Sequence, residues 1–192
     1  MKSFQIISIL VIAGTLLGVL LHYLAVGRRK GRRQSPSHSN MSVWEKLVYG
    51  TTVVSFLALV GTGFYPAIVH GARLGGFLLM AHTVIGGVFA VALTPLVLTW
   101  AESGLLGRGA GRLDEWCKVF FWLLALAALV SMGSMFLSMT SLLGAEDLET
   151  LAQVHRWDGL LLIVVMLVHS YLRGLTRCTG RVASRKLEAE TL

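Results

Sequence analysis

Four of the six histidines in this chain fall within or at the ends of long apolar segments, where an ionisable side chain is costly and tends to be functional. They are His22, His82, His155 and His169. His155 and His169 are 14 positions apart in one segment, which on an α-helix puts them within about 40° of one face and about 21 Å apart along the axis. Because an imidazole nitrogen is a common axial ligand of haem iron, this spacing suits two haems stacked across a membrane.

The depth of each histidine in its segment predicts which of them meet. His82 lies a few residues into its segment and His155 about one turn into the last one, both counted from the same predicted membrane surface. Gly86 follows His82 by one turn and leaves space for a flat macrocycle beside the backbone. Gly61 and Gly63 are candidates for leaving space in the same way, although glycine in membrane helices also serves close packing. The alternative for His82 and His155 is a hydrogen bond between helices or a place at the interface.

The composition predicts an all-α membrane protein that carries these histidines. Of the 192 residues, 55% are hydrophobic and 14% are charged, against roughly 25% charged in a soluble domain. The mean hydropathy is +0.71. At about 20 apolar residues a crossing, the chain has room for five transmembrane helices and no separate catalytic domain. The apolar segments are Phe4–Val26, Val43–Ile68, Leu74–Trp100, Val119–Leu143 and Leu151–Leu172. We expect a four-helix haem-binding bundle with one extra N-terminal helix.

Basic residues give the expected orientation. The chain has 17 Lys and Arg against 10 Asp and Glu, and all but Lys2, Arg73 and Arg156 lie in the loops and tail on one side of the predicted membrane. This placement excludes a nucleic-acid surface and puts the N-terminus outside and the C-terminus in the cytoplasm of a bacterial inner membrane. The expected units are an anchor helix (1–26), a basic linker (27–42), the bundle (43–173) and a tail (174–192). The linker serves as a topology determinant or binds anionic lipid.

Residues 41–173 resemble the membrane di-haem cytochrome b (gamma) subunits of respiratory formate dehydrogenases and nickel–iron hydrogenases. The resemblance is carried by VWEKLVYGTTVVSFLALVGTGF, by GGFLLMAHTVIGGVFA and by LAQVHRWDGLLLIVVMLVHSYL. It implies that His82 and His155 hold an outer haem, that His169 holds a cytoplasm-side haem, and that electrons pass to a quinone. Family members open the first helix of the unit with a histidine, where this chain has Tyr49.

His22 offers a replacement for the ligand that the Tyr49 position lacks. It lies at the cytoplasmic end of the first segment, at about the depth of His169. An interfacial histidine at a helix end is the alternative for His22, and Tyr49 is either an oxygen ligand or an ordinary interfacial tyrosine. Arg73 and Arg156 are candidates for contact with haem propionates, or else interfacial anchors.

Two functions follow as hypotheses. The first is a membrane b-type cytochrome subunit that transfers electrons between a partner redox subunit, of iron–sulfur or cytochrome c type, and the quinone pool of a respiratory complex. Two haems are expected and one is possible; without a CxxCH motif, any haem is of b type. In this case the catalytic chemistry of the oxidoreductase complex belongs to the partner subunits. The second is a small non-haem transporter or assembly subunit whose histidines handle protons or metal ions.

Overall fold

A computed structural model describes residues 2–27, 42–71, 74–106 and 112–190 of the chain. The prediction of an all-α protein is confirmed, since the described residues fold into long helices joined by short turns. Five helices are long and apolar enough to cross a membrane, and the chain is a multi-pass membrane protein. The elements are α1 (Lys2–Gly27), α2 (Val43–Tyr65), the π-helical turn η1 (Pro66–His70), α3 (Gly76–Leu106), α4 (Arg112–Ser138) and α5 (Ala145–Glu190).

The last two helices differ most from their predicted bounds. α4 begins and ends several residues earlier than predicted. It ends at Ser138 because residues 139–144 form a turn, in which the Met139 amide donates to the Phe136 carbonyl. α5 begins at Ala145, where the Asp147 carboxylate accepts a hydrogen bond from the Gly144 amide at 3.2 Å and acidic side chains lie in the first turn. The predicted tail continues α5 as helix as far as Glu190.

Proline ends α2 and creates η1. Pro66 has no amide hydrogen, so the regular α-helical ladder cannot continue through it, and the five residues Pro66–His70 take the wider π-helical winding. The turn closes at Gly71, whose amide donates to the Pro66 carbonyl and whose φ of 58° is the left-handed conformation that glycine adopts most readily. The end of α2 therefore points the chain back into α3.

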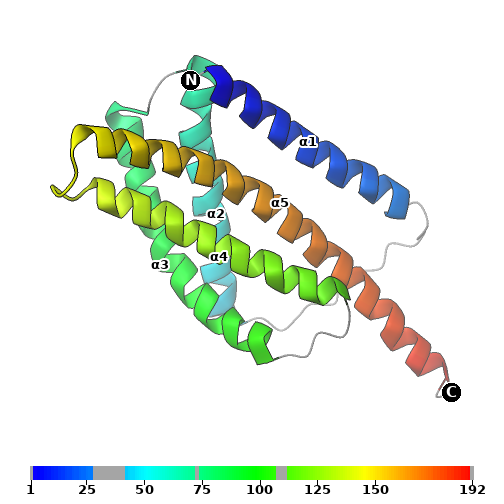
Figure 1. Cartoon of the computed structure of the whole chain (residues 1–192). Helices are drawn as coiled ribbons and strands as arrows, with labels where there is room; N and C mark the ends of the chain where they lie inside the picture. The colour runs from blue at the N-terminus through cyan, green and yellow to red at the C-terminus, as the bar shows by residue number, and fades with distance from the viewer. Residues whose placement is uncertain (1, 28–41, 72–73, 107–111, 191–192) are drawn as a thin grey trace.

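The spans form two antiparallel hairpins that cross. α2 packs along α3 and α4 packs along α5, and the first hairpin lies across the second (Figure 1). Side chains of α3, α4 and α5 close the middle of the bundle, with the core residues Phe89, Leu93, Ala127, Ala128 and Leu162. The small side chains of α4 let its backbone approach its neighbours closely. We call the end of the bundle that holds η1 and the α4–α5 turn the η1 end.

α1 lies along the outside of α5 and is attached to the bundle near both of its ends (Figure 1). At the η1 end, the Gln5 amide donates to the carbonyls of Ala67 at 2.7 Å and Ile68 at 3.2 Å, which belong to the unpaired carbonyls at a helix C-terminus. Phe4 packs edge-on against Trp157, with ring centroids 5.1 Å apart. Only 6% of the α1 span is buried against 22% of the α5 span, so α5 is the central helix and α1 a peripheral one.

Candidate functional site

The structure brings His82 and His155 together at the η1 end of the bundle. Their ring centroids are 6.1 Å apart and the ring planes are nearly perpendicular, at 87°. His82 comes from α3 and His155 from α5, so the contact joins the two hairpins. The prediction that these two histidines meet across the bundle agrees with this geometry.

A hydrogen bond to Thr62 holds the His82 ring through Nδ1. The Thr62 hydroxyl oxygen lies 2.8 Å from His82 Nδ1, and the same hydroxyl lies 2.8 Å from the Ala58 carbonyl, which can only accept. When the hydroxyl proton goes to the carbonyl, the oxygen accepts from Nδ1–H of His82. The lone pair of the ring is then on Nε2.

The His155 ring has the same tautomer for a related reason. Its Nδ1 lies 3.2 Å from the Ser131 carbonyl, and because a carbonyl has no proton, Nδ1 is the donor. The hydroxyls of Ser131 and Ser134 lie around the same nitrogen, each at 3.2 Å. Both rings are thus oriented through Nδ1 and keep the Nε2 lone pair, which is how a metal-ligating histidine is usually held.

Glycine leaves the space that the His82 ring occupies. A Cβ atom placed on Gly63 would lie 3.1 Å from His82 Cε1, closer than ordinary contact. A Cβ on Gly86 would make ordinary contact with Leu59 of α2, at 3.9 Å, and the place of Gly86 beside a haem stays a prediction. A Cβ on Gly61 would meet nothing within 4 Å. Of the glycines considered from the sequence, Gly63 is the one that this site requires.

His169 lies further along α5, on the side that faces α4. Its side chain is 8% exposed, and its ring centroid is 6.3 Å from that of Phe121. Its Nδ1 is buried without a hydrogen-bond partner. Neither a ring contact nor a hydrogen bond joins His169 to another histidine within the part of the chain that the structure describes.

The structure places His22 away from His169. His22 Nδ1 pairs with the Tyr171 hydroxyl, and the two rings meet edge-on with centroids 5.5 Å apart. His169 and Tyr171 are two positions apart on α5, which is about 200° around the helix axis. The ring of His22 therefore lies on the other side of α5, where it helps to attach α1.

We expect His22→Ala to leave the haem content of the purified protein unchanged, because its observed partner is Tyr171 rather than His169. His22→Ala and Tyr171→Phe remove the same contact, so we expect each variant to lower the free energy of unfolding by a similar, small amount of about 1 kcal/mol. Haem content per polypeptide and thermal unfolding in detergent measure the two effects. Loss of one of two haems in His22→Ala, but not in Tyr171→Phe, would show that His22 is a haem ligand.

The remaining sequence candidates are placed as follows. Arg156 is half-buried and adjacent to His155 at the η1 end, whereas Arg73 lies outside the described residues. Tyr49 is 44% exposed in the second turn of α2, towards the other end of the bundle. The roles of both arginines at a haem propionate stay predictions.

Comparison of the chain with protein-family models, with curated proteins and with solved structures gave no match.

Sequence reasoning did not select Thr62, Ser131, Ser134 or Asp158. Asp158 follows His155 by one turn of α5, is 9% exposed, and has a carboxylate oxygen, Oδ2, that is buried without a hydrogen-bond partner. An acidic residue inside an apolar span was the signal available for it. Serine and threonine carried no such signal, because in membrane helices they often bond to their own backbone, as Thr62 also does.

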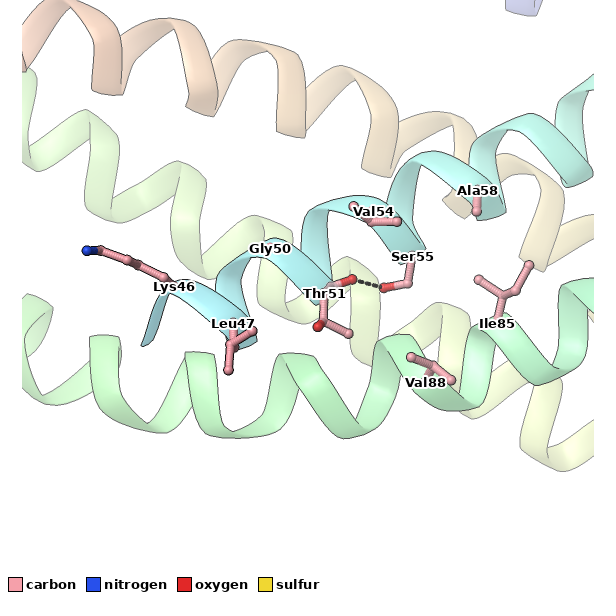
Figure 2. Close-up of a pocket in the computed structure, with 9 residues that line it drawn as sticks. All are labelled: Lys46, Leu47, Gly50, Thr51, Val54, Ser55, Ala58, Ile85 and Val88. Carbon is pink, nitrogen blue, oxygen red and sulfur yellow. Dashed lines mark hydrogen bonds between the residues drawn. The ribbon is translucent and has the colours of Figure 1, made fainter. Parts of the chain in front are cut away.

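An open apolar groove runs between α2 and α3. It has a volume of about 490 Å³, within the range of small-molecule sites, and Figure 2 shows Lys46 at one end and Ala58 with Ile85 at the other. Small residues such as Gly50 line the α2 wall between these ends. Ala58 lies one helical turn before Thr62, so the inner end of the groove is close to the His82 site.

Proposed function

We propose that the chain is a membrane-integral b-type cytochrome subunit of a respiratory complex, in which His82 and His155 are the axial ligands of one haem. The observation that carries this proposal is the meeting of two imidazoles from different helices, each oriented through Nδ1 with the Nε2 lone pair available. A haem held there supplies a one-electron Fe(III)/Fe(II) couple.

The separation of the rings fits one shared iron. A bond between a metal and an imidazole nitrogen is about 2 Å, and roughly another 1 Å lies between that nitrogen and the ring centroid, so two axial rings have centroids about 6 Å apart. The observed separation is 6.1 Å.

The donor set favours haem over a bare metal ion. A protein site for a free transition metal usually needs three or four side-chain ligands. Among the residues that the structure describes there is no group of three or more His, Cys, Asp and Glu placed to hold an ion. A porphyrin supplies four nitrogens itself and needs two more ligands, which is the number of imidazoles here.

We place the quinone that exchanges electrons with the subunit in the groove between α2 and α3. Its apolar wall suits an isoprenoid chain, and its inner end is one turn from Thr62, the hydrogen-bond partner of His82. The partner redox subunit, of iron–sulfur or cytochrome c type, is proposed to contact the η1 end. With the N-terminus outside and the C-terminus in the cytoplasm of a bacterial inner membrane, the His82/His155 haem is the outer one.

The decisive experiment is a reduced-minus-oxidised spectrum of the purified protein, followed by a pyridine haemochrome assay. A red protein with the α-band of low-spin b-type haem and at least one haem per chain is the expected result. The haem count then decides whether His169 holds a second one. A colourless preparation from haem-sufficient cells would overturn the proposal and favour the transporter or assembly hypothesis.

The orientation is tested at Cys178, in the part of α5 that follows its apolar span. We expect a membrane-impermeant thiol reagent to miss Cys178 in intact cells and to label it in inverted vesicles, because most basic loops lie on its side. Cys117 is buried and should contribute little label. The variant Cys178→Ser provides the background. Labelling in intact cells would reverse the orientation and make the His82/His155 haem the inner one.

The groove is tested by filling it. A side chain added at Gly50 enters space that is open within 4 Å, so Gly50→Phe is expected to block the groove without displacing a helix. Haem content should stay at the wild-type value, while reduction of the haem by a quinol analogue slows at least tenfold. Gly87→Phe, at an open and exposed position on α3, is the matched control. Equal rates of haem reduction by the quinol analogue in Gly50→Phe and Gly87→Phe would mean that the quinone binds elsewhere.

A further inference from the structure

The distance between the His82 and His155 rings depends on how the two hairpins of the bundle lie against each other. Each ring is hydrogen-bonded within its own hairpin, His82 to Thr62 of α2 and His155 to the Ser131 carbonyl of α4. These hydrogen bonds orient the rings, but they do not hold α3 and α5 at a fixed separation. The backbones of the two hairpins approach each other closely between α3 and α4, around the core in the middle of the bundle. An element that contacts both hairpins at the η1 end therefore bears on the spacing of the rings.

The first turns of α1 contact both hairpins at this end (Figure 1). The ring centroid of Phe4 is 6.2 Å from that of Phe64 near the end of α2, and 5.1 Å from that of Trp157 on α5. Phe64 directly follows the glycine that borders one ring of the site, and Trp157 lies two positions after His155. Phe4 thus joins the two segments, one from each hairpin, that border the site.

Gln5 attaches α1 to the first hairpin by hydrogen bonds. Its side-chain amide donates to the Ala67 carbonyl at 2.7 Å and to the Ile68 carbonyl at 3.2 Å. Both carbonyls belong to η1, which continues α2, and they lie where a helix ends and carbonyl groups lack intrahelical partners. Gly71 leaves space for the amide, because a Cβ atom there would lie 3.1 Å from Gln5 Nε2. An apolar side chain at position 5 cannot satisfy these carbonyls.

Ser8 indicates how closely α1 approaches the bundle at this end. Its exposed fraction is 0%, although only 6% of the α1 span is buried. A small side chain permits such an approach between membrane helices. The Ser8 hydroxyl oxygen is buried without a hydrogen-bond partner, so packing, and not a hydrogen bond of Ser8, accounts for its place. We call Phe4, Gln5 and Ser8 the α1 clamp.

We propose that the α1 clamp holds the two hairpins at the separation at which His82 and His155 can share one iron, with Phe4 and Gln5 as positioning residues. The arrangement of the hairpins is a property of the protein alone, whereas the shared iron rests on the function proposed above. The tolerance is small, because metal–ligand distances in proteins vary by about 0.2 Å, and a displacement of about 1 Å takes a ring out of bonding distance. α1 thus contributes to the site without supplying a ligand.

The primary test measures the separation of the hairpins and needs no haem. Spin labels attached at Val84→Cys on α3 and Val154→Cys on α5, two exposed positions beside the site, report this distance by double electron–electron resonance. We expect one narrow distance distribution in the parent protein. Gln5→Leu keeps the length of the side chain without its donors, and Phe4→Ala removes the ring between the hairpins. Both variants are expected to give a broader distribution with a longer mean distance.

Two controls separate the clamp from a general loosening of the bundle. Labels at Leu57→Cys and Val84→Cys, both within the α2–α3 hairpin, should report the same distance in every variant. His22→Ala releases α1 at its other end, so it should leave the distance between the hairpins unchanged. All proteins carry Cys117→Ala and Cys178→Ser, so that only the introduced cysteines are labelled.

Carbon monoxide binding provides a second, spectroscopic readout. If both rings bind the iron of a reduced haem, little of that haem is open to carbon monoxide. We expect the fraction that binds carbon monoxide to rise about tenfold in Gln5→Leu, since two hydrogen bonds are lost and each is worth a few-fold in an equilibrium. His22→Ala should bind as little carbon monoxide as the wild type.

The outcomes separate this inference from the proposed function. An unchanged distance between the hairpins in Gln5→Leu and Phe4→Ala would overturn the inference, whether or not the protein binds haem. A protein without haem in which that distance changes would refute the proposed function and support the clamp. In a protein that holds haem, equal carbon monoxide binding in Gln5→Leu and His22→Ala would show that the clamp does not set the ligand spacing. If Gln5→Leu fails to assemble, the distance in Phe4→Ala decides in the same way.

Discussion

Replacing either His82 or His155 with alanine is expected to remove the same haem, and to do so almost completely. In the proposed site each ring would supply one of the two protein ligands of the haem iron, so loss of either would leave the haem with a single imidazole. We expect both variants to lose more than nine-tenths of the low-spin b-type signal, with the same difference spectrum. Reduced-minus-oxidised spectra and haemochrome content, normalised to polypeptide, measure the loss.

A histidine outside the site is the matched control for these two variants. His70 is exposed at the same end of the bundle, with its ring 5.4 Å from that of Tyr65, and His70→Ala should keep the full haem content. Helical content by circular dichroism establishes that the variants fold. Full retention of low-spin haem in His82→Ala would refute the ligand pair, and unequal losses in His82→Ala and His155→Ala would mean that the two rings do not share one iron.

The spans were predictable from the sequence, but the faces that they turn to one another were not. Length and apolar composition determine whether a segment can cross a membrane, and from these two properties all five membrane-spanning helices were predicted. In a soluble helix the polar face also indicates the direction of the core, whereas in a membrane both lipid and protein accept apolar side chains. The rotation of α1 about its axis therefore could not be predicted from hydropathy, and His22 faces Tyr171 rather than His169.

The site was predictable to the extent that it depends on depth. His82 and His155 are rare residues in their spans and lie at matching depths, so their contact followed from the sequence. Their hydrogen-bond partners did not, because Thr62 is 20 positions from His82 and Ser131 is 24 positions from His155. Such pairs are created by helix packing, and hydroxyl residues are too common in membrane helices to indicate them.

Gly63 was likewise indistinguishable from Gly61 in the sequence, and the structure separates the two sharply. A Cβ atom at position 63 would lie 3.1 Å from His82 Cε1, whereas one at position 61 would meet nothing within 4 Å. Because Thr62 holds the adjacent ring atom, Nδ1, at 2.8 Å, a movement of His82 Cε1 away from position 63 strains that hydrogen bond. A side chain at position 63 thus disturbs both the place of the His82 ring and its hydrogen bond to Thr62.

We therefore expect Gly63→Val to lower haem content at least tenfold, and Gly63→Ala to keep more haem while broadening its α-band, because its single methyl group requires only a small shift of the ring. Gly61→Val makes the same change in helix propensity and in membrane hydropathy two residues earlier, and should keep the wild-type spectrum. Haem content per folded polypeptide compares the three variants. Since valine costs the helix the same amount at either position, a difference in haem content between Gly61→Val and Gly63→Val reports on the contact with His82 alone. Equal haem contents in these two variants would show that the His82 ring is not an iron ligand in the arrangement seen here.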